Sequence, residues 1–347
     1  MNDYFHRLIQ QTPTHFWINN PTREHADRAI QAGADGCTCN PSYSQKMLDH
    51  PTEGAYAYTL LDEAIHESHD AWQAAEILQR KLVAPIALKF LPHYRSDPKT
   101  RGFVSIQADP VNDTDPQSML RQALDNCSVS ENICCKIPIT ETGLQVVEEL
   151  VSRNIPINAT EIFGVSQMIA LCEHYERVAR KTGKRPTLFM SHIAGIYDDY
   201  FQAYVKNEKI DISPDVVWQA GLAVARKVYH IMKERGYPAI FVGGGARGLH
   251  HFTEMVGGEV CITINWEGTA DKLLETDPPV VYRLFNPGPQ KVIDELMEKL
   301  PDFRRGYLED GLRVEEFEEF GPVQLFRSSF EKSWRKVLDL VNQRMNQ

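Results

Sequence analysis

Short apolar runs recur along the chain, and longer stretches with a different hydrophobic period separate them. Leu144, Val147 and Leu150 share one face if residues 141–153 form a helix, and 164–182 and 214–236 show the same period. The short runs are β-branched or apolar, and most are flanked by Gly, Pro or Asn, which is typical of strands. The predicted strands are 15–19, 36–40, 103–108, 133–137, 155–159, 187–192, 239–243 and 260–265.

This alternation of strands and helices predicts a parallel sheet, because parallel neighbours are joined by crossover helices. Eight such units fit a closed (β/α)8 barrel, the TIM barrel of the α/β class. The structural alternative is an open, doubly wound sheet, which usually carries a GxGxxG turn after its first strand. No such turn follows residues 15–19, so we expect the barrel.

Two regions exceed what eight units need. The segment 41–102 is long, and its apolar part 84–90 is an alternative third strand. We expect a single domain over 1–347, with helices from about 280–347 packed on the barrel. The alternative for this tail is a contact between subunits of a homo-oligomer. Its amphipathic period is carried by Phe326, Phe330, Trp334, Val337 and Val341.

The charge balance limits the partners of the chain. Its formal net charge is −10 and its pI is about 5.7. An acidic surface repels phosphate backbones and anionic lipids, so we expect neither nucleic acid nor a membrane as partner. No apolar run approaches the roughly 18–20 residues of a spanning helix. Residues 1–11 also lack the apolar core of a secretory signal.

The seven cysteines indicate a reducing environment. Their number is odd, and some lie inside strand-like runs, as Cys134 and Cys135 do. We therefore expect free thiols in the cytoplasm rather than a disulfide framework. Cys37 and Cys39 have no Cys or His pair at a zinc-like spacing, so we expect no metal site.

Lys136 lies near the end of a predicted strand, inside an otherwise apolar run. If its side chain points into the barrel, burial disfavours the ammonium form and leaves a neutral amine. A neutral amine is what attack on a carbonyl requires. If the side chain points outward, it is an ordinary lysine whose head reaches solvent. The run alone favours neither orientation.

Uncharged hydrogen-bonding residues end several other predicted strands, where a barrel places its active site. Side chains two residues apart on a strand point to the same face, so Ser105 and Gln107 share one face and Asn158 and Thr160 share another. Such a set suits a polyhydroxylated substrate around one amine, although each residue singly is common at a strand end. The set comprises Thr38, Asn40, Ser105, Gln107, Asn158, Thr160, Ser191 and, beside them, His192.

The segment FVGGGARG at 241–248 suits an anion-binding loop. Three glycines let backbone N–H groups approach a ligand, a helical pattern follows, and Arg247 adds a fork of donors. Loops after the last two barrel strands often hold phosphate. The alternative is a glycine-rich turn with a solvated arginine.

At this point five segments resemble those of the transaldolase family, in the family's order. Residues 38–42 (TCNPS) resemble its TTNPS signature, and 136–140 (KIPIT) resemble its lysine segment KIPAT. Residues 158–163 (NATEIF) are similar to its NxTLxF stretch. Residues 191–195 (SHIAG) and 243–247 (GGGAR) resemble its SPFVG and GASFR segments in altered form.

The resemblance implies roles for individual residues. Lys136 would form a Schiff base with a ketose, and Asn40 and Asn158 would bind substrate hydroxyls or position the lysine. Thr160 would help to hold a catalytic water. Ser191 would contact the substrate, and Arg247 would bind its phosphate. No metal or organic cofactor is expected, because the lysine itself supplies the electron sink.

Four positions depart from the family pattern. Asn19 stands where transaldolases carry an aspartate, and Gln107 stands where they carry a glutamate, as in the fructose-6-phosphate aldolases. Ile193 occupies the position of a tyrosine in those aldolases, and Ile196 that of a second phosphate-binding arginine. Asn and Gln are not acids or bases at neutral pH. A water held by Gln107 and Thr160, or His192, would have to move the proton, unless His192 merely packs in its loop.

Three functions remain open on these residues. The first is a transaldolase-like enzyme that transfers a dihydroxyacetone unit between sugar phosphates. The second is an aldolase that cleaves fructose 6-phosphate or an atypical ketose, as the missing charged residues suggest. The third is a catalytically silent barrel that binds a sugar, although an unpaired buried lysine would be costly to keep there.

Overall fold

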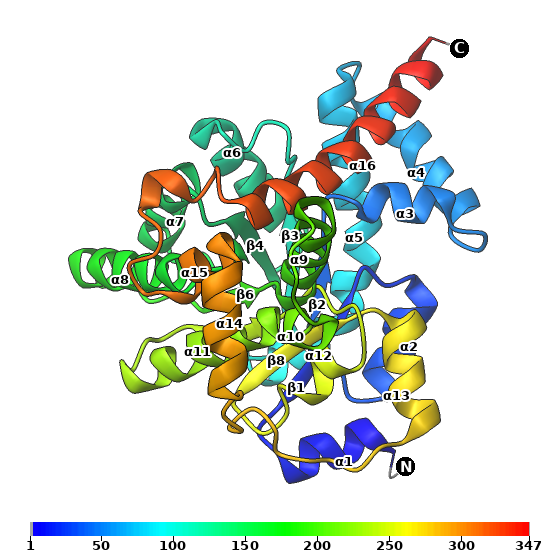
Figure 1. Cartoon of the computed structure of the whole chain (residues 1–347). Coiled ribbons are helices and arrows are strands. Elements are labelled where there is room, and N and C mark those ends of the chain that lie inside the picture. Colours follow the sequence, from blue (N-terminus) through cyan, green and yellow to red (C-terminus); the bar gives the residue numbers. More distant parts are fainter. Residues whose placement is uncertain (1–2, 347) are drawn as a thin grey trace.

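The computed structural model describes residues 3–346 and contains a closed barrel of eight parallel strands. Neighbouring strands pair in chain order and β8 returns to β1, so the predicted (β/α)8 barrel is confirmed. Figure 1 shows the helices arranged around this sheet. The strands are β1 (His15–Asn19), β2 (Cys37–Cys39), β3 (Val104–Gln107), β4 (Ile133–Pro138), β5 (Ile157–Ile162), β6 (Leu188–His192), β7 (Ile240–Gly243) and β8 (Val260–Ile264).

The helices fill the connections between strands and form the C-terminal tail. The first eight are α1 (Tyr4–Gln11), α2 (Arg23–Gln31), α3 (Tyr43–Asp49), α4 (Gly54–Glu67), α5 (Ala71–Ser96), α6 (Pro116–Cys127), α7 (Glu141–Ser152) and α8 (Val165–Thr182). The others are α9 (Ala194–Glu208), α10 (Pro214–Val217), α11 (Ala220–Glu234), α12 (His250–Thr253), α13 (Asp271–Thr276), α14 (Gln290–Lys299), α15 (Pro301–Tyr307) and α16 (Gly321–Met345). Short helices of other kinds span Trp266–Ala270 and Val314–Glu316. Within residues 3–346, no helix combines the length and apolar character needed to cross a membrane.

Three predicted boundaries differ from the structure. The apolar segment 84–90 belongs to α5, because its apolar residues continue the buried face of that long helix. Residues 214–236 form two helices, since the Gly221 amide at the start of α11 donates to Asp198 Oδ1 at 2.7 Å rather than continuing α10. The fifth strand runs on to Ile162, past its predicted end at residue 159, with a register irregularity between Ala159 and Ile162.

The barrel interior has an apolar floor and a polar upper layer. Side chains of alternate strands meet inside a barrel in layers. One buried cluster consists of Trp17, Phe103, Cys134, Phe189, Val242 and Cys261, and it fills the floor. Nearer the carboxyl ends, the register aligns Gln107 with Lys136 and Lys136 with Asn158. The polar residues of these strands therefore gather at one end of the barrel.

Helix α16 lies across this end of the barrel. Figure 1 shows it (red) passing beside α9 and reaching toward α3 and α4, and it also contacts α5 and β5. The amphipathic period predicted for the tail faces the protein in this helix. Its residues Phe326, Phe330, Trp334, Val337 and Val341 are all buried. The helix therefore covers the polar layer and contributes residues to it.

Candidate active site

A cavity of about 320 Å³ opens at the carboxyl ends of the strands. Residues predicted from the sequence line it, among them Asn19, Asn40, Lys136, Ser191 and Arg247. None of the residues that line it in the described chain is acidic. The rest of its wall is formed by Asn20, Thr38, Ser42, Lys46, Ile193, Ile196, Gly244, Gly245, Thr263, Asn265, Phe326, Ser329 and Phe330.

Lys136 points from β4 toward this cavity and is only 4% exposed. Burial lowers the pKa of its amine to about 8, although the nearby Glu161 carboxylate opposes this shift. The Nζ atom donates to Asn40 Oδ1 at 2.5 Å. The lowered pKa therefore gives this lysine far more neutral, oriented amine near neutral pH than an ordinary lysine has, and the neutral amine is the form that attacks a carbonyl.

An amide and hydroxyl network fixes Asn40 beside the lysine. Asn19 Oδ1 accepts from Thr38 Oγ1 at 2.8 Å and from Asn40 Nδ2 at 3.1 Å. Asn19 Nδ2 in turn donates to Asn265 Oδ1 at 2.9 Å. These bonds determine which end of the Asn40 carboxamide faces Lys136. Asn19 thus holds the network in place, and as an amide it has no proton to give to a substrate at neutral pH.

A second array runs across β3, β5 and β6. Ser191 Oγ donates to Asn158 Oδ1 at 2.7 Å, and Asn158 Nδ2 donates to Ser105 Oγ at 3.1 Å. All three residues are buried. Asn158 does not line the cavity, whereas Ser191 does. Asn158 is therefore placed to orient Ser191 and to pack beside Lys136, its partner in the β4–β5 register.

Glu161 is a buried carboxylate that the sequence analysis did not single out. Its Oε1 atom accepts from Gln107 Nε2 at 2.8 Å, and the residue is fully buried. Strand parity places residues 158 and 160 on one face and would turn residue 161 the other way. The irregularity in β5 changes this, since Glu161 adopts a φ of 60° just where the register shifts. The sequence signal that could have indicated this site was the single acidic residue in the predicted strand-end segment NATEIF.

Further charged groups from distant parts of the chain surround Glu161. Arg327 of α16 donates through Nε to Asp113 Oδ2 at 3.2 Å and through Nη1 to Glu318 Oε1 at 2.8 Å. Burial raises the pKa of Asp113 to about 8, with the Glu161 charge adding to the effect and Arg327 opposing it. Burial also raises the pKa of Glu161, while Arg327, Gln107 and Lys136 oppose that rise. The cluster therefore holds two competing buried carboxyls near one guanidinium.

The rim of the cavity carries two further cations. Arg247 Nε donates to Asp199 Oδ2 at 2.6 Å, and its side chain is 45% exposed. Lys46 Nζ donates to the Asn20 carbonyl at 2.8 Å. The helix expected after the glycine-rich loop is the four-residue α12, so that loop lacks a helix long enough to hold an anion at its end. Arg247 and Lys46 are the groups on this rim that suit an anionic ligand.

Three of the predicted residues are buried and do not line the cavity beside Asn158. Gln107 is the last residue of β3 and bonds to Glu161, and Thr160 lies in β5 next to Glu161 in the sequence. His192 turns out of the barrel, where its Nε2 contacts the Gly221 carbonyl at 3.3 Å. Burial lowers the pKa of His192 to about 4. The structure therefore places Gln107 beside Lys136 in the register and Thr160 next to Glu161 in β5, and it leaves His192 neutral and outside the cavity.

One group of side chains has the composition of a metal site. Asp198, His250 and His251 offer ligand atoms within 4.8 Å of one another. His251 is already used at both ring nitrogens, because Nδ1 accepts from the Arg247 amide at 3.3 Å and Nε2 contacts Asp198 Oδ2 at 2.9 Å. The buried Asp198–His251 pair thus holds the loop that carries Arg247, and a metal ion would have to break it.

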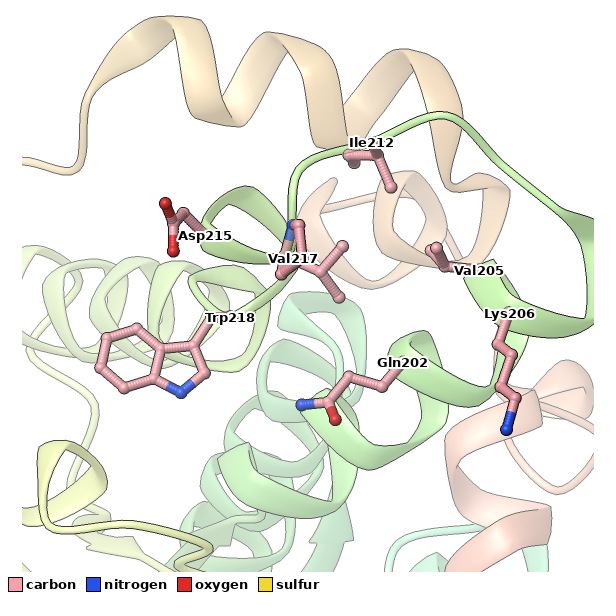
Figure 2. A pocket seen from close by; sticks show the side chains of 8 residues that line it. Gln202, Val205, Lys206, Ile212, Asp215, Val217 and Trp218 are labelled. Carbon is pink, nitrogen blue, oxygen red and sulfur yellow. The ribbon is translucent and has the colours of Figure 1, made fainter.

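A second hollow, of about 530 Å³, lies outside the barrel between α9 and α10 (Figure 2). Figure 2 shows its lining of aliphatic side chains, with Gln202, Lys206 and Asp215 at its polar parts and Trp218 at one edge. Trp218 stacks on His250 with ring centroids 3.7 Å apart. None of the residues predicted to carry chemistry lines this hollow. The cavity at the strand ends is therefore the candidate active site.

The fold and the site define a (β/α)8 barrel with a buried lysine at the face where enzymes of this fold hold their active sites. A model of the transaldolase/fructose-6-phosphate aldolase family matches residues 16–313, and the chain belongs to this family. Its enzymes are of the transaldolase and class I aldolase type.

Individual relatives are only distantly similar. The chain is 25% identical to the transaldolase of Chlamydia pneumoniae over 304 residues, which is 83% of this chain and 84% of the relative. It is 24% identical to the transaldolase of Chlamydia trachomatis over 325 residues, or 88% and 90%. Transaldolase 2 of Nostoc punctiforme is 27% identical over 190 residues, and there the chain spans about half (47%) of the relative's length.

Proposed function

We propose that the protein is a transaldolase-like enzyme in which Lys136 forms a Schiff base with a ketose. The observation that carries this proposal is the buried amine at the cavity, with its pKa lowered to about 8 and its Nζ bonded to Asn40. A lysine of this kind is a nucleophile near neutral pH. The seven free cysteines favour action in the cytoplasm, and we further propose that the chain forms one domain.

The substrate we propose is a sugar phosphate. Lys46, Lys136 and Arg247 line a cavity without acidic residues, in a chain whose net charge is −10. An anionic ligand is therefore favoured locally against the overall charge. The hydroxyl and amide groups of Thr38, Asn40 and Ser191 supply donors and acceptors for the sugar hydroxyls. Arg247 is the proposed phosphate ligand.

The reaction begins when Lys136 attacks the ketone carbon and forms a carbinolamine. Loss of water gives an iminium ion, which withdraws electrons from the neighbouring carbon–carbon bond. That bond breaks as the C4 hydroxyl loses its proton, so an aldehyde leaves and a three-carbon enamine stays on Lys136. Attack of the enamine on a second aldehyde forms a new carbon–carbon bond, and hydrolysis of the resulting iminium by water releases the product ketose and frees Lys136. Asn40 and Asn158 hold the amine and Ser191 in position.

Aldol cleavage is the second candidate function. The cavity wall has Ile193 and Ile196 where charged or phenolic groups would grip a substrate, so an atypical ketose with fewer charges also fits. In that case the enamine takes a proton, and water hydrolyses the resulting iminium to release the three-carbon ketone and the free amine. The outcome depends on how long water is kept from the enamine.

Reductive trapping tests the proposal. The protein is incubated with fructose 6-phosphate, sedoheptulose 7-phosphate or dihydroxyacetone in the presence of borohydride, and the modified peptide is identified by mass. We expect a reduced adduct on Lys136 that is absent from Lys136→Met. Lys46→Met is the matched control, because Lys46 lines the same cavity and should leave labelling at Lys136 in place.

Failure of every donor to label Lys136, while a known transaldolase labels well under the same conditions, would contradict the Schiff base. Labelling at Lys46 in place of Lys136 would do the same. A protein that binds these sugars without any adduct would be a sugar-binding barrel rather than an enzyme.

A further inference from the structure

The end of β5 holds its carboxylate in a backbone conformation that is unusual for glutamate. Glu161 has a φ of 60°, in the left-handed region that residues other than glycine seldom adopt. Strain of this kind persists only where the surroundings enforce it, and it is common at functional sites. Here the result is that the side chain reaches Gln107, whose register partner is Lys136.

Three polar atoms around Glu161 are buried without a hydrogen-bond partner among the described residues. They are Glu161 Oε2, Gln107 Oε1 and Thr160 Oγ1. Buried polar atoms are nearly always paired with protein groups, ordered water or ligand. They come from the carboxyl ends of β3 and β5, the two strands that flank Lys136 on β4. A water or a substrate oxygen bound there has donors and acceptors on both sides of the amine.

We propose that Glu161 is the acid–base group of this site and exchanges protons with the ketose on Lys136 through water held by Gln107 and Thr160. This inference rests on the proposed Schiff base. It supplies the proton donor that Asn19 and Gln107 are unable to provide at neutral pH.

The charges that face Glu161 come from three parts of the chain. Lys136 acts on it from β4, Asp113 from the segment after β3, and Arg327 from α16. Glu318 and Glu331 act on the same cluster through Asp113. Because like carboxyls in a dry site do not both ionise readily, the charge of Glu161 adds to the rise in the pKa of Asp113. Burial raises the pKa of both groups, so a protonated carboxyl is available there at neutral pH.

The proton cycle closes without any other reactant. As the amine adds to C2, the ketone oxygen takes the proton that the amine loses. Glu161 then donates its proton through water to the carbinolamine hydroxyl, which leaves as water while the C2–N iminium forms. The resulting carboxylate next accepts, through water, the proton of the C4 hydroxyl. The C3–C4 electron pair moves into the iminium, the aldehyde departs, and Glu161 is protonated again.

The competing explanation is structural, in which Glu161 only balances the charge of Lys136. The pH profile separates the two. With an acid–base Glu161, the active form has a protonated Glu161 and a neutral Lys136, so the rate falls on both sides of an optimum. Without that acid, activity requires only a neutral Lys136. The rate then rises with pH and stays level, and the alkaline decline is lost.

The test compares Glu161→Gln with the pair Glu161→Asp and Glu161→Asn. The last two have equally short side chains that are tolerated at a positive φ, and they differ in the ionisable group alone. Glu318→Gln is the matched control, because Glu318 bonds to Arg327, whose charge acts on Glu161, but is not bonded to Gln107. The rate of cleavage is measured from about pH 6 to about pH 10, with the donor that labels the wild-type protein, and the adduct on Lys136 is trapped in the same samples.

We expect Glu161→Gln and Glu161→Asn to lose about 100-fold or more in rate and to lose the alkaline decline, while the lysine still labels slowly. Glu161→Asp should keep the decline, and Glu318→Gln should keep both the rate and the profile. If Glu161→Gln and Glu161→Asn still label at Lys136 and their pH–rate profiles keep both the acidic and the alkaline decline, the acid–base role of Glu161 is wrong while the Schiff base stands. A wild-type protein that never labels would instead overturn the Schiff base, and this inference with it.

Discussion

The polar groups on the two sides of Lys136 differ in how they are satisfied. On one side, which we term the amide side, Asn19, Thr38, Asn40 and Asn265 bond to one another and carry no charge. On the other, the carboxyl side, Gln107, Glu161, Asp113 and Arg327 include unpartnered atoms and two carboxyls with raised pKa values. Lys136 bonds to the amide side and lies in the field of the carboxyl side.

This difference suits the two sides to different tasks, the amide side to orienting the Lys136 amine and the carboxyl side to the proton transfer proposed above. A fully paired neutral network keeps one geometry at every pH in the working range, so it suits the positioning of an amine. A buried cluster with more carboxyls than cations holds an exchangeable proton, which a neutral network does not. The substitutions below act on one side or on the amine between the two.

Removal of the amine should have the largest effect. Lys136→Met keeps the length of the side chain but has no nucleophile, so turnover should fall by at least about four orders of magnitude. The variant should also unfold at a higher temperature, because it no longer buries a group that is charged in the unfolded chain. Steady-state rates and thermal melting measure both effects. Substantial residual turnover with unchanged KM would show that Lys136 is not the nucleophile.

Much of this site follows from the sequence because hydrophobic period and strand ends are local. The runs around Lys136, Asn40 and Ser191 predicted the strands and their polar ends, although the Lys136 run alone favoured neither an inward nor an outward side chain. Glu161 did not follow, since one irregular residue in β5 reverses the parity used to predict its direction. Arg327 and Asp113 are separated by 214 residues in the sequence, and no local period indicates their contact. His192 was expected beside the substrate, but its neighbour Ser191 takes the inward position, so the ring turns outward.

A charge placed on the amide side should have the next largest effect. Asn40→Asp puts a carboxylate where Asn40 Oδ1 now accepts from Lys136 Nζ. An opposite charge at hydrogen-bond distance raises the pKa of a lysine by about 1–3 units. The acidic limb of the rate profile should therefore move to higher pH, and the rate at neutral pH should fall by about 10- to 1,000-fold.

Asn40→Ala is the control for this charge effect, because it removes the hydrogen bond without adding a carboxylate. Its acidic limb should stay near the wild-type position, although its rate falls. If both variants move the limb equally, the charge argument is incorrect and the hydrogen bond alone determines the pKa.

Loss of the rim cation should have a smaller effect that depends on the substrate. Arg247→Gln removes a charge-assisted contact to phosphate, which is worth about 1.5–3 kcal/mol. The KM for a phosphorylated donor should rise by about 10- to 100-fold, and the KM for dihydroxyacetone should change less. Lys46→Gln, on the opposite part of the rim, serves for comparison. An equal rise for both donors in Arg247→Gln would mean that the arginine maintains its loop through Asp199 and Gly245 rather than binding phosphate.

The smallest expected effect lies on the carboxyl side and concerns stability. Asp113 has a folded-state pKa of about 8, above its ordinary value of 3.8. Between these values the folded protein binds the proton more tightly than the unfolded chain does, so the free energy of unfolding decreases as pH rises. Asp113→Asn keeps an acceptor for Arg327 Nε and removes this dependence. Thermal melting from about pH 5 to about pH 9 should show the variant gaining a few degrees on the wild type as pH rises, and a constant difference would place the raised pKa on Glu161 alone.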